Sequence, residues 1–165
     1  MTVYDSPARD PRDLRLYGPR LPIRVGRPIL RDAVQSQTSG ESQFTTVPAL
    51  IDTGAQRTVL TPTAVKKIGL AKIDETQLRG VGGVVSNIGV YVASIQFANS
   101  KFATIEAIAV SCCELGHPLI ECLLGRDVLS RWTFTYNGPA GSWQIREEGV
   151  GLWVEPPEGL DLWGE

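Results

Sequence analysis

Short β-prone runs separated by glycine-containing turns are the feature that most constrains how this chain can fold. The runs are rich in Val, Ile, Thr and Phe, and in several of them apolar and polar residues alternate, as in half-buried strands. Only one segment has a convincing helical pattern. Many short strands joined by turns are typical of barrels and sandwiches, so we predict a mostly-β fold with one or two short helices.

Individual strands can be placed from composition and alternation. Pro22 and Pro28 indicate an edge or a break in the first strand, and the polar segment 32–44 is predicted to be a loop. The predicted strands cover 21–30, 45–51, a glycine-rich hairpin and a long strand over 77–98, 101–110, two strands over 132–145 around an Asn-Gly-Pro-Ala-Gly turn, and 151–154.

TPTAVKKIGL, residues 61–70, is the best helix candidate. Thr61 can cap its N-terminus, Pro62 fits the first helical position, and Gly69 can end it. Val65 and Ile68, three positions apart, lie on one face of this helix. Lys66 and Lys67 point away from that face. A second, shorter helix is predicted in DVLSRW, with Asp127 as its N-cap.

The length of 165 residues favours a single domain. Residues 1–20 carry Arg, Asp and Pro and are interpreted as a loose, flexible lead-in. Residues 21–146 are predicted to form the domain. Residues 147–165 are interpreted as a C-terminal extension whose Leu and Trp residues suit docking or an interface.

Charge and hydropathy exclude several classes of function. Sixteen Lys and Arg stand against eighteen Asp and Glu, for a formal net charge of −2. That balance creates no field that attracts nucleic acid or an anionic membrane. The sequence has no run of about 18 apolar residues that would predict a transmembrane helix, and its N-terminus lacks the apolar segment of a secretory signal. We therefore expect a cytoplasmic protein.

The cysteines indicate a reducing compartment rather than a disulfide framework. Their number is odd, and the chain shows no secretory signal. Cys112, Cys113 and Cys122 form the pattern Cys-Cys-x3-His-x4-Cys with the only histidine, His117, and this pattern departs from zinc-site spacings. Buried or inert thiols are therefore favoured over a zinc site, and we predict no metal.

The stretch ALIDTGAQRTVL, residues 49–60, runs an apolar strand into an aspartate and a sharp turn. A carboxylate at the end of a buried strand is costly unless it is paired or hydrogen-bonded. Gly54 lets the backbone bend tightly, and Thr53 offers a hydroxyl and an amide. Asp52 is therefore either a turn residue satisfied by local amides or a catalytic group.

Catalysis by such an aspartate needs a second carboxylate. A lone carboxylate is a weak base at neutral pH, whereas the pKa values of two carboxylates that share a proton split apart. One can then act as general base on a water and the other as general acid toward a carbonyl oxygen. The DTG triplet occurs once in this chain.

Four segments, in order, resemble retropepsin-like aspartic proteases, the known case of such a carboxylate pair. ALIDTGAQRTVL looks like their active-site segment, and TPTAVKKIGL looks like the helix that often follows it. LRGVGGVVSNIGVYVASI is similar to their flap hairpin and the strand leaving it, and LLGRDVLSRW resembles their Gly-Arg-Asp segment. The resemblance covers about residues 20–146.

The resemblance implies a single-domain acid protease barrel that hydrolyses peptide bonds without a cofactor. Pepsin-like chains carry two aspartate motifs and this chain carries one, so the dyad would combine Asp52 from two subunits of a homodimer. Thr53 and Gly54 would support the dyad, and Arg126 and Asp127 would be structural, as a charge pair. The implied substrate-binding residues are Ala55, Gln56, Gly82, Gly83 and Val84.

The glycine-rich hairpin around residues 80–89 would act as a flap that closes over the substrate. A peptide would lie extended along strand edges, with alternate side chains in pockets. We expect apolar side chains beside the scissile bond, because the predicted pocket residues are Val59, Val84, Leu123 and Ile51.

Gln56 departs from the retroviral pattern, which usually has an acidic residue there, and is closer to the cellular DNA-damage-inducible and bacterial branches. The partner of Arg126 is therefore open: Asp127 can bond the arginine or cap its helix. Two alternatives to an active protease also stay open. One is a non-catalytic relative that uses the fold for dimerisation or peptide binding, and the other is an unrelated β-barrel in which DTG is a plain turn.

Overall fold

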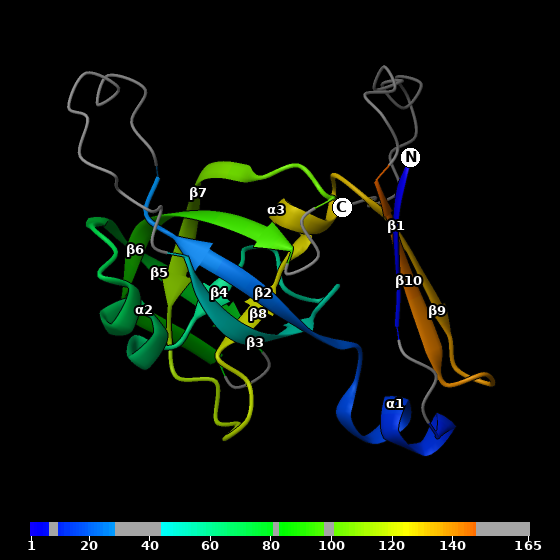
Figure 1. Ribbon diagram of the computed structural model, residues 1–165. Coiled ribbons are helices and arrows are strands. Elements are labelled where there is room, and N and C mark those ends of the chain that lie inside the picture. Colours follow the sequence, from blue (N-terminus) through cyan, green and yellow to red (C-terminus); the bar gives the residue numbers. More distant parts are fainter. Residues whose placement is uncertain (7–9, 29–43, 81–82, 98–100, 148–165) are drawn as a thin grey trace, which may run out of the picture.

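The computed structural model describes residues 1–6, 10–28, 44–80, 83–97 and 101–147. Within these ranges the chain forms a barrel beside a small three-stranded sheet (Figure 1). The elements are β1 (Thr2–Asp5), α1 (Pro11–Tyr17), β2 (Arg20–Gly26), β3 (Thr45–Ile51), β4 (Val59–Leu60), α2 (Pro62–Ile68), β5 (Lys72–Gly80), β6 (Gly83–Phe97), β7 (Ile105–Cys112), β8 (Cys122–Leu124), α3 (Arg126–Leu129), β9 (Thr133–Asn137) and β10 (Ser142–Glu147).

Pairing between β2 and β6 closes the barrel. The larger sheet has the order β2-β3-β8-β4-β7-β6-β5, and the additional β2–β6 pairing makes a ring of all its strands except β5. This pairing runs antiparallel from Ile23 opposite Phe97 to Gly26 opposite Ser94. Closure leaves the ring without free edges. The predicted mostly-β barrel is confirmed.

Alternation along the strands fills the barrel with apolar side chains. In β3, Val47, Ala49 and Ile51 are buried, whereas Leu50 is only half-buried on the opposite face. Burying an aliphatic side chain of this kind stabilises the fold by about 1.5–3 kcal/mol. Because side chains alternate with a period of two, Asp52 continues the face of Leu50, outside the core.

The prolines of the first predicted strand are accommodated in different ways. Pro22 lies inside β2, opposite Pro48 of β3, and the pairing of β2 with β6 begins only at Ile23. Proline has no backbone N–H to donate to a neighbouring strand. It is therefore tolerated at position 22, where β2 is paired with β3 but not yet with β6. The strand ends at Gly26, before Pro28.

Helix α2 forms as its sequence signals predict. The side chain of Thr61 accepts a hydrogen bond from the N–H of Ala64, and Pro62 occupies the first turn. Gly69 ends the helix in the left-handed conformation, at φ 71°. The apolar face, which includes Val65 and Ile68, is buried.

Several strand boundaries differ from the prediction. The hairpin arm β5 begins at Lys72 rather than at residue 77. Strand β7 covers Ile105–Cys112 rather than 101–110. The strands predicted at 45–51 and around the Asn-Gly-Pro-Ala-Gly turn form as β3, β9 and β10.

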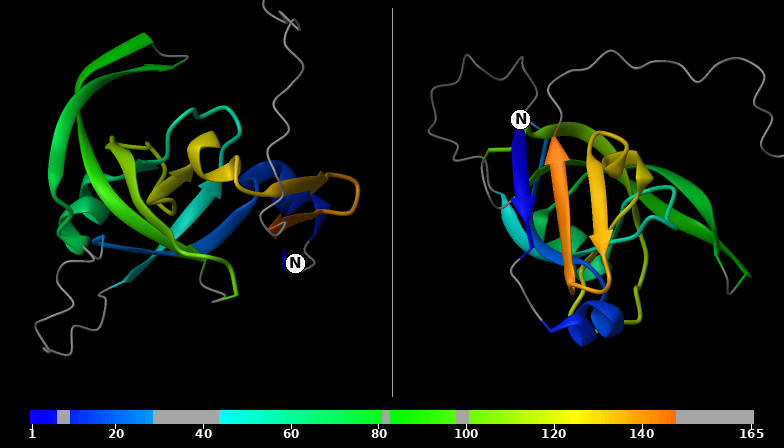
Figure 2. Two further views of the ribbon diagram at one scale, coloured as in Figure 1. Left: turned by 90° about the horizontal axis from the view of Figure 1, so that it is seen from above. Right: turned by 90° about the vertical axis from the view of Figure 1, so that its right-hand side faces the viewer.

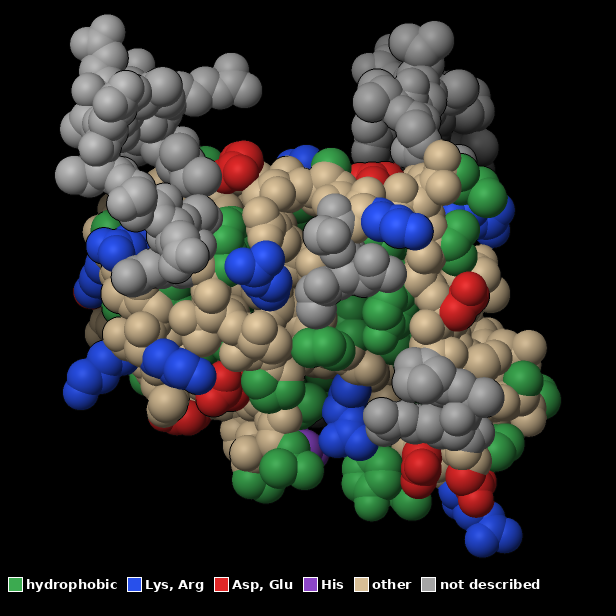
Figure 3. Space-filling model, viewed as in Figure 1, with side chains coloured by type: hydrophobic (Ala, Val, Ile, Leu, Met, Phe, Trp, Pro, Cys, Tyr) green, Lys and Arg blue, Asp and Glu red, His purple; other side chains and the backbone are tan. Residues whose placement is uncertain are grey.

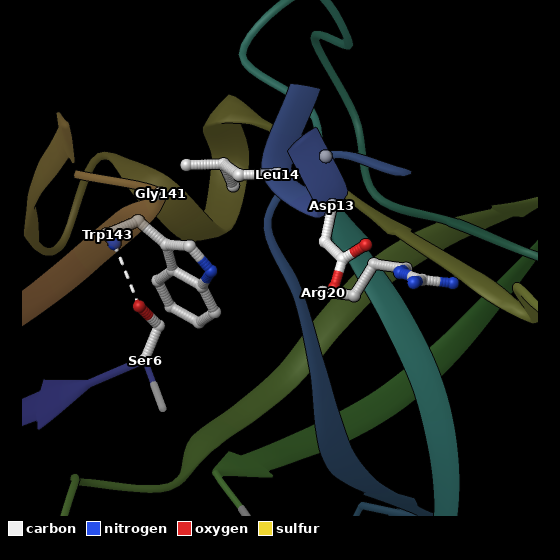
Figure 4. A pocket seen from close by; sticks show the side chains of 7 residues that line it. Ser6, Asp13, Leu14, Arg20, Gly141 and Trp143 are labelled. Carbon is white, nitrogen blue, oxygen red and sulfur yellow. Dashed lines mark hydrogen bonds between the residues drawn. The ribbon is translucent and has the colours of Figure 1, made fainter. Parts of the chain in front are cut away.

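The prediction of a loose lead-in over residues 1–20 is wrong for two elements found there, β1 and α1. Strand β1 pairs antiparallel with β10 in the sheet β1-β10-β9, to the right of the barrel in Figure 1. Tyr4 stacks on Trp143, with ring centroids 5.3 Å apart. The N–H of Trp143 also donates to Oγ of Ser6, at 2.8 Å (Figure 4).

Helix α1 is also held in place, by an N-terminal cap and by one buried side chain. Asp10 caps it by accepting from the N–H of Arg12, and Leu14 packs into the core, 5% exposed. Leu14 and Trp143 both line a small cavity of about 30 Å³ (Figure 4). Apolar residues of this segment contact strands far along the chain: Tyr4 lies against both Phe97 of β6 and Trp143 of β10.

Some predictions fall outside the described residues. They concern the strand at 151–154, almost all of the loop 32–44, Gly82, and the C-terminal extension after Glu147. The limits of the predicted domain stay a prediction. Within the described ranges, no helix has the length and apolar character needed to cross a membrane.

Leu14→Ala should destabilise the protein by roughly 2–5 kcal/mol, because it removes a buried side chain and enlarges the cavity beside it. Leu16→Ala on the same helix should change stability by no more than about 0.5 kcal/mol, since Leu16 is 65% exposed. Urea unfolding of both variants at one fixed protein concentration checks this. Equal effects would contradict the docking of α1.

Candidate active site

Asp52 lies directly after β3, where this strand runs parallel to β8. Its N–H donates to the carbonyl of Leu124 at 3.0 Å, which continues the β3–β8 pairing into the turn. The side chain is half-buried. Its Oδ1 accepts from the N–H groups of Gly54 at 2.8 Å and Ala55 at 3.2 Å. The Asx-type turn is therefore present, and it fixes the orientation of the carboxylate.

The loop after Asp52 is held by the start of α3. The guanidinium Nη1 of Arg126 donates to the carbonyls of Thr53 at 2.8 Å and Gly54 at 3.2 Å. The backbone N–H of Arg126 donates to the carbonyl of Ala55, at 2.9 Å, and the next N–H along the chain donates to that of Gln56, at 3.2 Å. Every residue from 52 to 56 thus has a backbone bond to the segment 124–127 or to its arginine side chain.

Asp127 holds the far end of the same loop. Its carboxylate accepts from the N–H of Thr58, at 3.0 and 2.9 Å to the two oxygens, and from the Thr58 hydroxyl at 2.8 Å. Oγ1 of Thr58 accepts in turn from the N–H of Gly125, at 3.1 Å. Thr58 is completely buried, so these bonds satisfy polar groups that water does not reach.

The predictions for Arg126 and Asp127 need two corrections. The N-cap position of α3 is Gly125, and Asp127 lies in the first turn. Arg126 and Asp127 form no charge pair, because the only salt bridge among the described residues joins Lys72 and Glu75. Neighbouring residues on a helix point in different directions, so these two bond to opposite ends of the loop.

Gly125 allows the loop and α3 to approach closely. A Cβ at this position would lie 2.5 Å from the carbonyl carbon of Arg57 and 2.8 Å from its oxygen. Both are backbone atoms that cannot move aside without disturbing the loop. Each residue of the Gly-Arg-Asp segment therefore has its own role. Gly125 permits the close approach, Arg126 donates hydrogen bonds to the turn, and Asp127 accepts hydrogen bonds from Thr58.

Four further predicted site residues, at positions 53–56, lie on the loop after Asp52. Thr53, Gly54 and Gln56 are exposed, and Ala55 is half-buried. A Cβ on Gly54 would lie 3.1 Å from Oδ1 of Asp52, which favours glycine at this position. The roles in catalysis and substrate binding that the sequence suggested for these residues stay predictions.

The predicted flap corresponds to the hairpin of β5 and β6. Gly83, at φ 112°, pairs with Gly80 at its end, and Val84 is 52% exposed. The hairpin and the loop after β3 project to the same side of the barrel (Figure 2). The register shifts twice along the hairpin, between Lys72 and Asp74 and between Thr76 and Leu78.

An apolar cavity of about 370 Å³ opens on the face of β3 that carries Asp52. Leu50, two residues before Asp52, lines it together with Leu123, its register partner on β8. In Figure 3, hydrophobic side chains gather near the single histidine at the lower edge of the molecule. The complete lining is Leu16, Tyr17, Gly18, Leu50, Leu115, His117, Ile120 and Leu123.

The cavity agrees only partly with the predicted pocket. Leu123 lines it, whereas Ile51 and Val59 are buried, at 5% and 7% exposure, and do not. The alternation of β3 contained the signal for Leu50, because it shares the face of Asp52. The contribution of α1 could not be deduced from alternation, since it depends on where the helix docks.

The cysteines and the histidine do not form a cluster. Burial raises the pKa of Cys122 far above its usual range, and desolvation, followed by the charges of Cys113 and Glu114, raises that of Cys112. Nδ1 of His117 accepts from the N–H of Leu119, at 3.1 Å. The described residues contain no group of three or more His, Cys, Asp or Glu that could hold a metal ion.

The comparison with known protein families decides the assignment. A family model described as aspartyl protease matches residues 34–128, more than half of the chain. The chain belongs to the aspartyl protease family. This confirms the resemblance drawn from the four sequence segments, and the match includes Asp52 and ends within α3. No curated protein matches the chain significantly.

Solved structures of family members are also similar to this chain. EIAV protease complexed with the inhibitor HBY-793 has 22% identity and a TM-score of 0.42, over 68% of this chain and 85% of that chain. A retropepsin-like aspartic protease from Rickettsia conorii has 14% identity and a TM-score of 0.46, over 88% and 94%. The retroviral protease-like domain of Ddi1 from Leishmania major has 14% identity and a TM-score of 0.40, over 64% and 86%.

Thr58→Val should destabilise the protein by roughly 1–3 kcal/mol, because the buried N–H of Gly125 and the Asp127 carboxylate both lose a partner. Thr58→Ser keeps the hydroxyl and should cost only about 1 kcal/mol for the lost methyl group. Urea unfolding compares the two at one concentration. A valine variant as stable as wild type would show that this network does not hold the loop.

Proposed function

We propose that this protein is an aspartic endopeptidase, in which Asp52 from each of two subunits activates a water molecule. The observation that carries the proposal is the geometry of Asp52. Its carboxylate lies outside the core, is oriented by two backbone N–H groups, and belongs to a loop that the segment 124–127 holds residue by residue. Catalytic groups need such preorganised support.

The chemistry requires two copies of the chain, because each carries one DTG turn. Across a two-fold axis, the exposed turn of one subunit would face the same turn of its partner. The two Asp52 carboxylates would then share one proton, since like charges held close cannot both ionise. Thr53 and Gly54 would keep the two turns in register, which is why they are proposed to support the dyad.

The reaction would proceed without a covalent intermediate. The ionised carboxylate takes a proton from a water molecule, and the oxygen of this water forms a bond to the peptide carbonyl carbon. The protonated carboxyl group donates its proton to the carbonyl oxygen. As the tetrahedral intermediate collapses and the C–N bond breaks, the carboxyl group that took the water proton gives it to the leaving nitrogen. The other carboxylate takes a proton from a hydroxyl group of the intermediate, so that the acid product forms and the pair again holds one proton. Arg126, through the carbonyls of Thr53 and Gly54, would hold the turn while charge moves.

The substrate would be an extended peptide with apolar side chains near the scissile bond. The cavity beside Leu50 and Leu123 supports this preference, because it is lined almost entirely by apolar side chains and shares a face with Asp52. The hairpin of β5 and β6, with Gly83 and Val84 near its end, would close over the peptide. Ala55 and Gln56 would contact the peptide backbone. We expect this activity in the cytoplasm.

Asp52→Asn should lower peptidase activity by at least about a thousandfold, because the amide can neither share the proton nor act as a base. Cleavage of a diverse peptide mixture is read by mass spectrometry from pH 3 to pH 8, with dimer content checked on the same samples. Wild type should cut best at acid pH, where the pair keeps one proton. Equal cutting by an equally dimeric variant would place the activity elsewhere, and no cutting by either protein would favour a peptide-binding module.

Mixing wild type with a tenfold excess of the Asp52→Asn protein should reduce wild-type activity to roughly a tenth, because most wild-type subunits then pair with an inactive partner. The mixture is incubated at low concentration, so that subunits exchange, and assayed at constant wild-type concentration. An equal excess of an unrelated protein is the control. Full activity in a mixture whose subunits have exchanged would show that one Asp52 suffices.

A further inference from the structure

Helix α1 lies outside the part of the chain that matches the aspartyl protease family, residues 34–128. It nevertheless forms part of the apolar cavity beside the candidate site. Leu16 and Tyr17 line this cavity together with Leu50 and Leu123, which lie within the matched part. A wall of the candidate substrate cleft therefore comes from a segment that the family model does not include.

Two sides of α1 serve different purposes. Leu14 is 5% exposed and anchors the helix in the core, whereas Leu16 and Tyr17 are 65% and 47% exposed. Exposed apolar side chains gathered in one place indicate a surface that binds something. Because these two residues line a cavity, we expect its occupant to be a side chain rather than a flat protein surface.

The position of α1 is fixed relative to Asp52. Gly18, at φ 69°, ends the helix, and its N–H donates to the carbonyl of Leu14 at 2.9 Å. The carbonyl of Pro19 then accepts from the N–H of Ile51, at 3.0 Å. Ile51 is the residue directly before Asp52, so the exit of α1 is hydrogen-bonded to the strand that carries the candidate catalytic group.

The Tyr17 ring is also held in place. The guanidinium carbon of Arg20 lies 4.7 Å from the ring centroid, in a cation–π arrangement. A Cβ on Gly18 would lie only 2.8 Å from Cδ1 of Leu50, so glycine lets the chain pass close to the cavity floor. A preorganised aromatic wall of this kind lowers the entropic cost of binding.

We propose that Leu16 and Tyr17 are specificity-determining residues, which form the outer wall of a subsite for one large apolar side chain, leucine-sized or aromatic, beside the scissile bond. This inference rests on the proposed peptidase function. The lining contains no carboxylate and no permanently charged group, and a cavity of about 370 Å³ lies within the range of small-ligand pockets. An apolar occupant fits both properties.

The test uses two hexapeptide pools that are identical except for a central Phe or a central Ala. Wild type should cleave the Phe pool with the higher kcat/KM. Leu16→Ala and Tyr17→Ala should each lower the ratio of the two kcat/KM values about tenfold, since an apolar contact carries discrimination of that order. Leu16→Trp, which narrows the cavity, should lower the same ratio by excluding Phe.

Leu119→Ala is the matched control. Leu119 is 62% exposed, close to the exposure of Leu16, and lies on the loop that carries His117, but it does not line the cavity. Its substitution should change the ratio less than twofold. A ratio that falls equally in the control, or that stays unchanged in all wall variants, would overturn the inference and leave the peptidase function standing.

Binding of the same pools to Asp52→Asn protein separates the two proposals. This protein should retain the Phe preference in binding, and the added Leu16→Ala substitution should remove it, as measured by ultrafiltration and mass spectrometry of the retained peptides. If the preference and its loss are seen but wild type does not cleave, the subsite stands and the catalytic proposal falls. If wild type neither binds nor cleaves either pool, both fall.

Discussion

The hydrogen bonds between Asp127 and Thr58 are the interaction on which the candidate site depends. The carboxylate accepts from the N–H and the hydroxyl of a completely buried threonine, and this hydroxyl accepts from the N–H of Gly125. Bonds to an ionised acceptor are stronger than neutral ones. They attach the end of the Asp52 loop to α3, while the bond from Asp52 N–H to Leu124 attaches its beginning to β8.

The barrel turns this local network into a rigid site. Because β2 pairs with β6, the ring is closed, and the β3–β8 pair that supports Asp52 lies within it. A functional loop on a rigid scaffold keeps its geometry. The hairpin differs, because β5 extends beyond the ring and its pairing with β6 shifts register twice. A stiff site beside a less constrained hairpin suits a reaction that must admit and then enclose a peptide.

The small sheet and α1 extend this arrangement beyond the matched family region. Strand β1 pairs with β10, and α1 lies near the lower end of that sheet in Figure 1, anchored by Leu14. The helix brings two exposed apolar residues to the face that carries Asp52. The catalytic geometry thus belongs to residues within the family match, whereas part of the cavity wall comes from the N-terminal segment. Chemistry and selectivity can change independently when they rest on different elements.

The sequence by itself determined the elements whose signals are local. Thr61, Pro62 and Gly69 define α2, and the Asx turn at Asp52 is formed by N–H groups two and three residues further along. Asp10, Pro11 and Gly18 are the same kind of signal for α1, but the many Arg and Asp residues around them led to the prediction of a loose segment. Only the tertiary structure decided that Asp127 bonds to Thr58, 69 residues away, and that Tyr17 and Leu123 line one cavity. Caps and turns depend on adjacent residues, whereas these contacts depend on the path of the whole chain.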